Sequence, residues 1–145
     1  MTPLHDNKIK DVMPESAWMT LKTDPNAMLV DCRTAQEWAV IGHPDLAEIG
    51  KAAHLIEWKI APDMRINPAF AEQVDAALFG TYPEKLFFIC RSGVRSKEAA
   101  TVIQAQLSGK SIACECINVA EGFEGHRGSD GPSGWRDKDL PMKHN

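Results

Sequence analysis

Short apolar runs recur along the chain and predict the strands of a buried sheet. Residues 27–32 (AMLVDC) and 86–89 (LFFI) are compact apolar runs that end at polar residues, a pattern typical of strands covered on both faces. Weaker apolar runs at residues 9–12, 52–58 and 112–119 predict three further strands. We therefore expect a sheet of four or five strands.

Helix-start patterns lie between these strands. Pro14 fits the first turn of a short helix. Thr34 and Glu37 stand three residues apart, as the two partners of a capping box do, so a second helix should begin there. Asn67 and Pro68 form a cap and a first-turn proline, and the apolar positions that follow fall on one face of a third helix.

The alternation of strands and helices predicts the architecture. A fourth helix should span residues 96–107, where apolar residues recur every four positions before a Ser-Gly pair ends the pattern. Parallel strands need such helical crossovers between them. We predict an α/β three-layer fold with a central parallel sheet of four or five strands and helices on both faces. Residues 1–145 should form a single domain.

Composition and charge narrow the classes of function. The 145 residues are 43% hydrophobic and 25% charged, as in an ordinary globular protein. The formal net charge of -4 argues against a general nucleic-acid binder. We find neither an apolar signal segment at the start nor a run long enough to cross a membrane, and four cysteines do not make a disulfide scaffold. We expect a cytoplasmic protein with no membrane segment.

The candidate chemistry lies where the apolar run 86–89 stops at Cys90. In parallel α/β sheets the functional crevice lies at the carboxyl ends of the strands. Backbone N–H groups in a tight loop, together with the start of the next helix, favour an anion, and Arg91 and Arg95 add full positive charges. Gly93 permits a backbone geometry that other residues resist. These groups favour a Cys90 thiolate that acts as a nucleophile, whereas the alternative is a buried structural cysteine beside solvated arginines.

Several segments then resemble one family. CRSGVRS, from Cys90, resembles the active-site loop of rhodanese-family sulfurtransferases. LVDCRTAQEWAVIGHPDL resembles the family's other signature, in which a strand ends in V-D-x-R and is followed by E-W and G-H. NVAEGFEG and GWRDKDLPM resemble the closing segments of single-domain members. The resemblance covers most of the chain from residue 28 onward and implies a rhodanese-like fold.

The resemblance also implies a reaction. Cys90 would accept sulfane sulfur from thiosulfate or a persulfide donor, sulfite would leave when thiosulfate is the donor, and a Cys90 persulfide would remain. Cyanide or a thiol would then take that sulfur, and the thiol acceptor includes a thioredoxin-like or other protein. No cofactor and no metal is implied.

The site residues follow from the same resemblance. The backbone amides of the loop would bind the persulfide, and the loop comprises Arg91, Ser92, Gly93, Val94, Arg95 and Ser96. The two arginines would steer an anionic donor. Asp31 and Arg33 would brace the loop through hydrogen bonds and ion pairing without reacting themselves.

Two other functions share the same loop. The first is a carrier module that relays persulfide sulfur for a protein partner. The second is a cysteine-dependent phosphatase or arsenate reductase, which uses five residues between Cys and Arg. Here four residues separate Cys90 from Arg95, and Ile89 rather than a histidine precedes the cysteine. A shorter loop makes a smaller cradle, which favours a sulfur atom over a phosphate group.

Other residues receive structural interpretations. Cys114 and Cys116 point to one strand face and should pack in the core, since no second pair completes a zinc site. Cys32, within the V-D-x-R motif, also reads as core. No general base is required once Cys90 is a thiolate, so we assign no catalytic histidine, His126 in the glycine-rich tail included. The chain departs from the family pattern by an insertion after the G-H pair, in GHPDLAEIGKAAHL.

Overall fold

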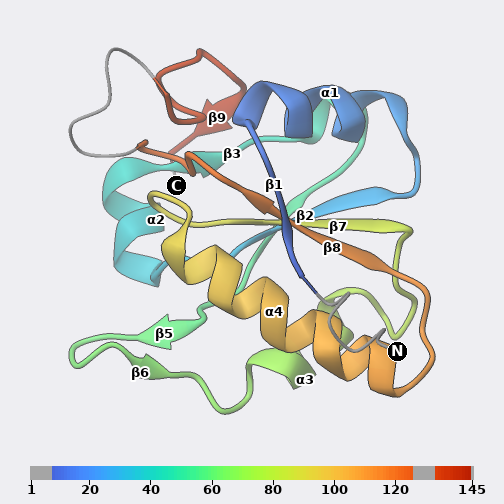
Figure 1. The fold of residues 1–145 in the computed structure, drawn as a ribbon. Coiled ribbons are helices and arrows are strands. Elements are labelled where there is room, and N and C mark those ends of the chain that lie inside the picture. Colours follow the sequence, from blue (N-terminus) through green and yellow to red (C-terminus); the bar gives the residue numbers. More distant parts are fainter. Residues whose placement is uncertain (1–7, 126–132, 145) are drawn as a thin grey trace.

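A central parallel sheet organises the chain. The computed structural model describes residues 8–125 and 133–144. The sheet has the order β1-β8-β7-β2-β4, with every neighbouring pair parallel (Figure 1). Its strands are β1 (Lys10–Val12), β2 (Ala27–Asp31), β4 (Ala53–Leu55), β7 (Lys85–Ile89) and β8 (Glu115–Val119). The predicted parallel sheet of four or five strands is confirmed, with β7 in the centre.

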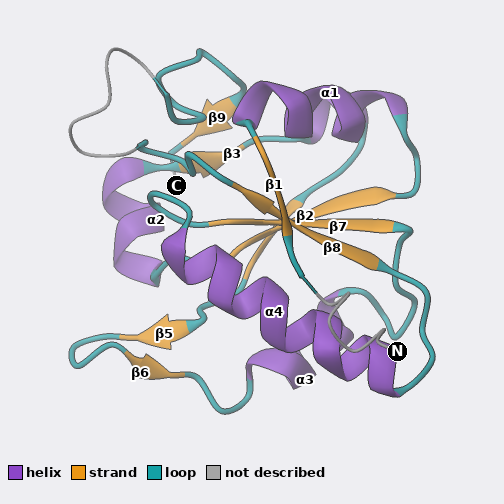
Figure 2. Cartoon of the chain, in the orientation of Figure 1, coloured by secondary structure: helices purple, strands orange, loops and turns teal. Residues whose placement is uncertain are grey.

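Helices cover both faces of this sheet (Figure 2). They are α1 (Pro14–Thr23), α2 (Ala35–Ile41), α3 (Phe70–Ala77) and α4 (Val94–Gly109). The core cluster on one face includes residues of α3 and α4, and the cluster on the other face includes residues of α1. The predicted three-layer α/β fold is therefore confirmed. None of these helices, nor any other helix in the described ranges, is long and apolar enough to cross a membrane.

Several short elements have no counterpart in the apolar pattern. They are β3 (His43–Pro44), which pairs with β9 (Met142–Lys143), the hairpin of β5 (Lys59–Ile60) and β6 (Arg65–Ile66), and the 3₁₀ turn η2 (Ala47–Ile49). Elements of two or three residues are too short to show a period, so sequence reasoning could not find them. Near the end of the described chain, Lys138 N–H donates to the Gly134 carbonyl and closes a hydrogen-bonded turn.

Two helices and two strands have other bounds than predicted. The fourth helix begins at Val94, two residues before the predicted start, because Gly93 adopts a left-handed conformation and lets the chain enter the helix at once. The third helix begins at Phe70, since Asn67 uses its side chain to accept from Ala69 N–H in the preceding turn. The runs 52–58 and 112–119 contain shorter strands than predicted, because each run includes loop residues that do not join the sheet.

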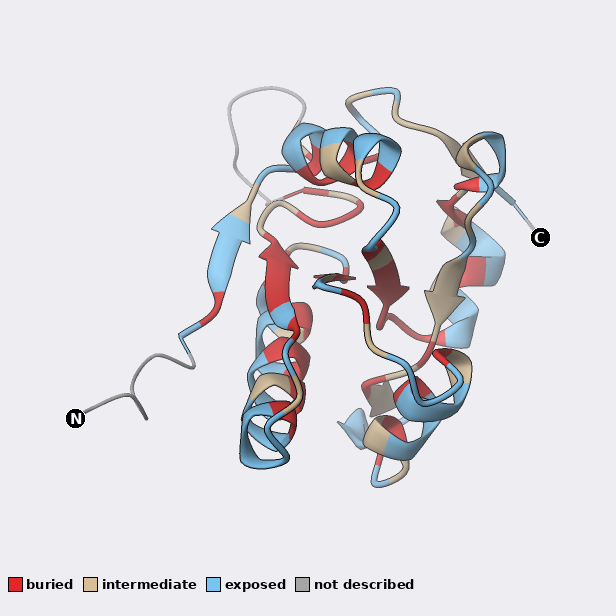
Figure 3. Cartoon of the chain, turned by 90° about the vertical axis from the view of Figure 1, so that its right-hand side faces the viewer, coloured by how far each residue is buried: buried red, intermediate tan, exposed pale blue. Residues whose placement is uncertain are grey.

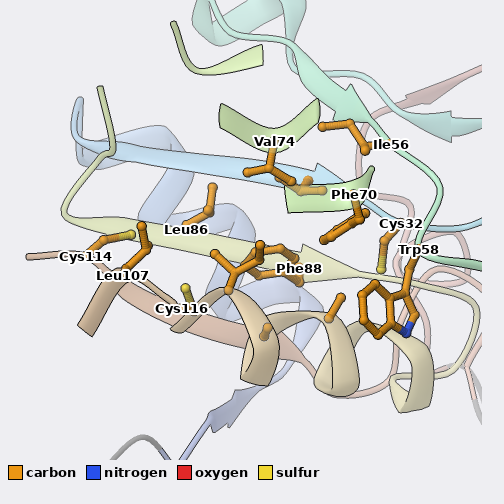
Figure 4. Packing of buried hydrophobic residues seen from close by; sticks show 14 of the residues in the cluster. Cys32, Ile56, Trp58, Phe70, Val74, Leu86, Phe88, Leu107, Cys114 and Cys116 are labelled. Carbon is orange, nitrogen blue, oxygen red and sulfur yellow. The ribbon is translucent and has the colours of Figure 1, made fainter. Parts of the chain in front are cut away.

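Alternating positions along the strands supply two cores. In Figure 3 the central strands are mostly buried, whereas each helix has buried and exposed sides. Val30 and Phe88 point to the face covered by α3 and α4, and their neighbours Leu29 and Phe87 point to the α1 face. Figure 4 shows the first of these cores from close by. Because successive strand residues point to opposite faces, the position of a residue in its strand decides which of the two cores it joins.

A buried ion pair lies at the end of β2. Arg33 donates to both carboxylate oxygens of Asp31, with Nη2 to Oδ2 at 2.7 Å, and both side chains are fully buried. Arg33 Nη2 also donates to the Gly42 carbonyl at 2.8 Å, and the guanidinium carbon lies 4.2 Å from the centre of the Phe123 ring. The pair therefore joins the end of β2 to the turn after α2 and to the segment after β8.

The insertion after His43 supports the opposite end of β2. Lys51 Nζ donates to three backbone carbonyls, at 2.7 to 2.8 Å, between the end of α1 and the start of β2. The acceptors are Leu21, Asp24 and Ala27. Leu46, from the same insertion, is buried in the α1-side core. This segment thus supports the start of β2 with three hydrogen bonds and one buried apolar side chain.

The buried ion pair yields a stability prediction. Removing one partner leaves the other charge buried and unpaired, so Asp31→Asn or Arg33→Met alone should lower the free energy of unfolding by about 3–5 kcal/mol. Urea unfolding measures this loss. The double variant should lose less than the sum of the two single losses, and strictly additive losses would contradict the coupling.

Candidate active site

Cys90 lies at the carboxyl end of the central strand. It follows β7 directly, and only 1% of the residue is exposed. Its carbonyl accepts a hydrogen bond from Phe123 N–H at 2.8 Å, and the carbonyl of the preceding Ile89 accepts from Cys32 N–H at 2.9 Å. The segments that follow both neighbouring strands, β8 and β2, thus hold the residue in place.

Three hydrogen-bond donors converge on the sulfur of Cys90. Gly93 N–H, Ser96 N–H and the Ser96 hydroxyl each lie 3.2 Å from Sγ. Gly93 immediately precedes α4 and Ser96 lies in its first turn, so the partial positive charge of this helix start is aimed at the same atom. An anionic sulfur, whether a thiolate or a persulfide, gains most from such a set of donors.

The turn from β7 into α4 tolerates no side chain at Gly93. Gly93 has φ +100°, and a Cβ atom there would collide with the carbonyl oxygen of Ala120. Gly122, with φ +62°, packs equally closely against the carbonyls of Cys90 and Arg91. Both glycines therefore keep the segment after β8 tight against the cysteine loop. The sequence argument identified the first of them and missed the second.

Asn118 positions the Ser96 hydroxyl. Its Nδ2 donates to the Gly93 carbonyl at 3.0 Å and to Asp11 Oδ1 at 2.9 Å, which leaves Oδ1 facing Ser96 Oγ at 2.5 Å. The hydroxyl has one proton for two neighbours, Asn118 Oδ1 and Cys90 Sγ, so it can turn toward the sulfur when the sulfur becomes an anion. Sequence reasoning missed Asn118, although an asparagine in the apolar run CINV is an available signal.

The two predicted arginines occupy different environments. Arg95 forms a bidentate ion pair with Glu37, at 2.8 and 2.9 Å. Arg91 is half exposed and lies 3.6 Å from Glu124, so its guanidinium is the more accessible of the two. An incoming anion would therefore meet Arg91 first, while Arg95 joins the loop to α2.

Glu37 caps the start of α2 and also binds Arg95. Its Oε1 accepts from Thr34 N–H at 3.0 Å, which confirms the predicted capping box, and from Arg95 at 2.8 Å. Burial alone would raise the pKa of Glu37, but the hydrogen bonds from Arg95 and Thr34 outweigh it and lower the pKa from 4.5 to about 2. The carboxylate thus stays ionised at any physiological pH.

A pocket of about 730 Å³ opens beside the loop. It is lined by α2, by the turn between β5 and β6, and by the two arginines of the loop. The apolar part of its lining includes Val40 and Met64, which are 66% and 39% exposed. Cys90 does not itself line this pocket, and the insertion after His43 contributes no residue to it.

The remaining predicted residues are less central. Ser92 is half-buried in the loop, and Val94 is exposed. Phe123 and Trp135, from the two closing segments, are fully buried in the α1-side core. His126 lies outside the described residues.

The other cysteines lie away from the loop or beneath it. Cys114 and Cys116 are buried free thiols in one core cluster, and the hydrogen bond with Cys114, together with burial, raises the pKa of Cys116. Cys32 is fully buried, and burial raises the pKa of its thiol well above the usual value. No group of three or more His, Cys, Asp or Glu side chains within residues 8–125 and 133–144 has the geometry of a metal site.

Comparison with known proteins agrees with this geometry. The sequence model of the Rhodanese-like domain matches residues 13–128. The chain belongs to the rhodanese family. An uncharacterized protein of Rickettsia prowazekii is 31% identical over 135 residues, which cover 93% of this chain and 98% of the relative.

Solved structures share the rhodanese fold. The crystal structure of Rv0390 from M. tuberculosis has a TM-score of 0.75 and 34% identity, and the match covers 94% of this chain and 98% of that one. The solution structure of a polysulfide-sulfur transferase homodimer from Wolinella succinogenes has a TM-score of 0.56 and 15% identity, over 98% and 85% of the two chains. The second likeness is one of fold alone.

The lowered pKa of Glu37 predicts that the protein is less stable in acid. Because the folded-state pKa is depressed, the stabilisation is complete above pH 4.5 and is lost as the pH falls toward about 2. At neutral pH the Glu37→Gln variant should be less stable than the wild type by up to about 3 kcal/mol. Urea unfolding at several pH values should show this difference shrinking below pH 4.5, and a difference that is constant with pH would contradict the assignment.

The Ser96 hydroxyl yields a reactivity prediction. Ser96→Ala removes one donor from the sulfur, and a hydrogen bond to a charged group contributes about 1.5–3 kcal/mol, so alkylation of Cys90 by iodoacetamide at neutral pH should slow by about tenfold. Asn118→Asp, which cannot donate to the Gly93 carbonyl, should also slow it. Gln106→Ala, at an exposed position farther along the same helix, is the control. Unchanged alkylation in Ser96→Ala would show that the hydroxyl does not stabilise the thiolate.

Proposed function

We propose that this rhodanese-family protein is a sulfurtransferase that carries sulfane sulfur on Cys90. The observation that carries the proposal is the set of three donors at 3.2 Å from the Cys90 sulfur, at the start of α4. Such a set stabilises the thiolate that attacks and the persulfide that results. The half-exposed Arg91 supplies a positive charge for an anionic donor.

The reaction has two displacements at sulfur. The Cys90 thiolate attacks the outer sulfur of thiosulfate, the sulfur–sulfur bond of the donor breaks, and sulfite leaves with the bonding electrons. A nucleophilic acceptor then attacks the outer sulfur of the Cys90 persulfide, and the Cys90 thiolate leaves. With cyanide the product is thiocyanate, and with a thiol it is a new persulfide. Neither step requires a general base.

Phosphate transfer is the less favoured chemistry for this loop. Four residues separate Cys90 from Arg95, and the guanidinium of Arg95 is held by both oxygens of Glu37. That arginine therefore offers few free donors to the oxygens of a bound phosphate or arsenate. The small cradle around Sγ supports the transfer of a single sulfur atom instead.

Steady-state assays with matched variants test this proposal. Cys90→Ala should abolish thiocyanate formation from thiosulfate and cyanide, because the sulfur has no carrier. Cys114→Ala removes another buried free thiol and should keep the activity. Equal activity in both variants would contradict the proposal, and turnover of an aryl phosphate with none of thiosulfate would favour a phosphatase.

The pocket favours a thiol as the acceptor. Its volume of about 730 Å³ exceeds what cyanide needs, and exposed Val40 and Met64 offer apolar contact to a larger molecule. We infer an acceptor that is either a small thiol or the thiol of a thioredoxin-like protein. A carrier module that receives sulfur only from a protein would use the same pocket, and it would show no loading of Cys90 by free thiosulfate.

Variants of the pocket rim separate acceptor binding from sulfur loading. Met64→Asp should raise the KM for a thioredoxin-like acceptor by roughly fivefold, since a lost apolar contact costs about 1 kcal/mol. The KM for cyanide should not change. Phe79→Asp replaces an exposed apolar residue that does not line the pocket and serves as the control. Equal effects on both acceptors would show that the rim does not recognise the thiol.

A further inference from the structure

Cys32 and Cys90 occupy facing positions at the ends of neighbouring strands. The registered pairs of β2 and β7 end with Asp31 opposite Ile89, and Cys32 N–H then donates to the Ile89 carbonyl at 2.9 Å. One further step of the same register places Cys32 opposite Cys90. Neighbouring strands are about 4.8 Å apart, and disulfide-bonded Cα atoms lie about 4.4–6.8 Å apart.

Both cysteines also point to the same face of the sheet. Cys32 belongs to the core cluster of α3 and α4 together with Val30, and Cys90 belongs to it together with Phe88. The intervening Ile89 belongs to the opposite cluster. Side chains that leave one face of adjacent strands at one level have nearly parallel Cβ directions, which a disulfide requires.

The Cys32 thiol is directed across the gap between the two strands. Its Sγ donates to the Ile89 carbonyl at 3.4 Å, which is a group of the strand that carries Cys90. Figure 4 shows Cys32 at the end of the core next to Trp58, while Cys114 and Cys116 lie toward the other end. Cys116 is level with Leu86, four residues before Cys90, so it lies about 13 Å along the strands from the loop.

We propose that Cys32 is a resolving thiol, which attacks the Cys90 persulfide, releases sulfide and leaves a Cys32–Cys90 disulfide. This activity rests on the proposed function, because it starts from the persulfide. It adds a second outcome to the reaction, in which a loaded sulfur that meets no acceptor is released as sulfide.

The step balances in atoms and electrons. Cys32 sulfur attacks Cys90 Sγ, a bond forms between the two cysteine sulfurs, and the bond from Cys90 Sγ to the outer sulfur breaks. The outer sulfur leaves as hydrosulfide with the bonding electrons, so it is reduced from the persulfide level to sulfide, Cys32 sulfur is oxidised from thiol to disulfide, and the oxidation level of Cys90 Sγ does not change. The Cys32 proton goes to solvent or to the leaving sulfide. A dithiol reductant then returns both cysteines to thiols.

The burial of Cys32 makes its attack on the persulfide slower than sulfur transfer to an acceptor. Cys32 is fully buried and donates its proton to the Ile89 carbonyl, and burial raises the pKa of its thiol. Its attack requires loss of that proton, so it is slower than attack by an acceptor that is already a thiolate. Cys32 therefore resolves only persulfides that no acceptor has discharged.

The test follows the loaded sulfur when no acceptor is present. Protein incubated with thiosulfate is desalted without oxygen, and free sulfide, intact mass and non-reduced peptides are then measured over time. We expect the wild type to lose the added sulfur, release sulfide and gain a cross-linked peptide that joins Cys32 to Cys90. Cys32→Ser should load the sulfur equally and lose the sulfide release. Cys116→Ser, at a buried cysteine of the same core, should behave as the wild type.

Separate outcomes distinguish this proposal from the proposed function. Equal sulfide release in Cys32→Ser, or no cross-linked peptide in the loaded wild type, would overturn the resolving role while sulfur loading stands. Absence of loading would overturn sulfur transfer from thiosulfate and, with it, the release of sulfide from thiosulfate-loaded protein. Treatment of the unloaded wild type with diamide, a thiol oxidant, tests whether Cys32 and Cys90 can form a disulfide. This experiment needs no sulfur donor and no variant protein. It should give the same cross-linked peptide, and its absence there would overturn the pairing itself.

Discussion

The site depends on the tight turn that carries the chain from β7 into α4. Within that turn Gly93 and Ser96 place three donors at 3.2 Å from one sulfur atom. The geometry requires a left-handed residue at position 93 and leaves no room for a Cβ atom, because the segment after β8 presses against it. Since β7 is the central strand, the segments after both neighbouring strands donate hydrogen bonds to the carbonyls of Ile89 and Cys90. These backbone contacts fix the position of the sulfur independently of any charged group.

Charge pairs hold the surrounding elements around this turn. The buried pair of Asp31 and Arg33 joins the end of β2 to the turn at Gly42, and the Arg33 guanidinium packs on Phe123, whose N–H holds the Cys90 carbonyl. On the other side Glu37 joins α2 to the loop through Arg95. Of the two loop arginines, Arg91 is the more exposed, so a chain with a net charge of -4 still presents a positive group beside its thiol.

The sequence predicts the fold better than it predicts which side chains contact one another in the site. Apolar runs and cap residues are local features, so the sheet, the capping box at Thr34 and the position of Cys90 follow from them. The partner of Arg95 is Glu37, 58 residues earlier, and no local pattern shows that the two meet. Asn118 was not predicted for the same reason, since its contact with the Ser96 hydroxyl depends on the proximity of β8 to the start of α4. The facing positions of Cys32 and Cys90 needed the strand register.

A crystal structure of the protein after incubation with thiosulfate would show where the sulfur is carried. We expect one additional sulfur atom bonded to Cys90 Sγ, within hydrogen-bonding distance of backbone N–H groups between Arg91 and Ser96. An unmodified Cys90 in protein that has demonstrably taken up sulfur, with the sulfur on another cysteine, would contradict this expectation.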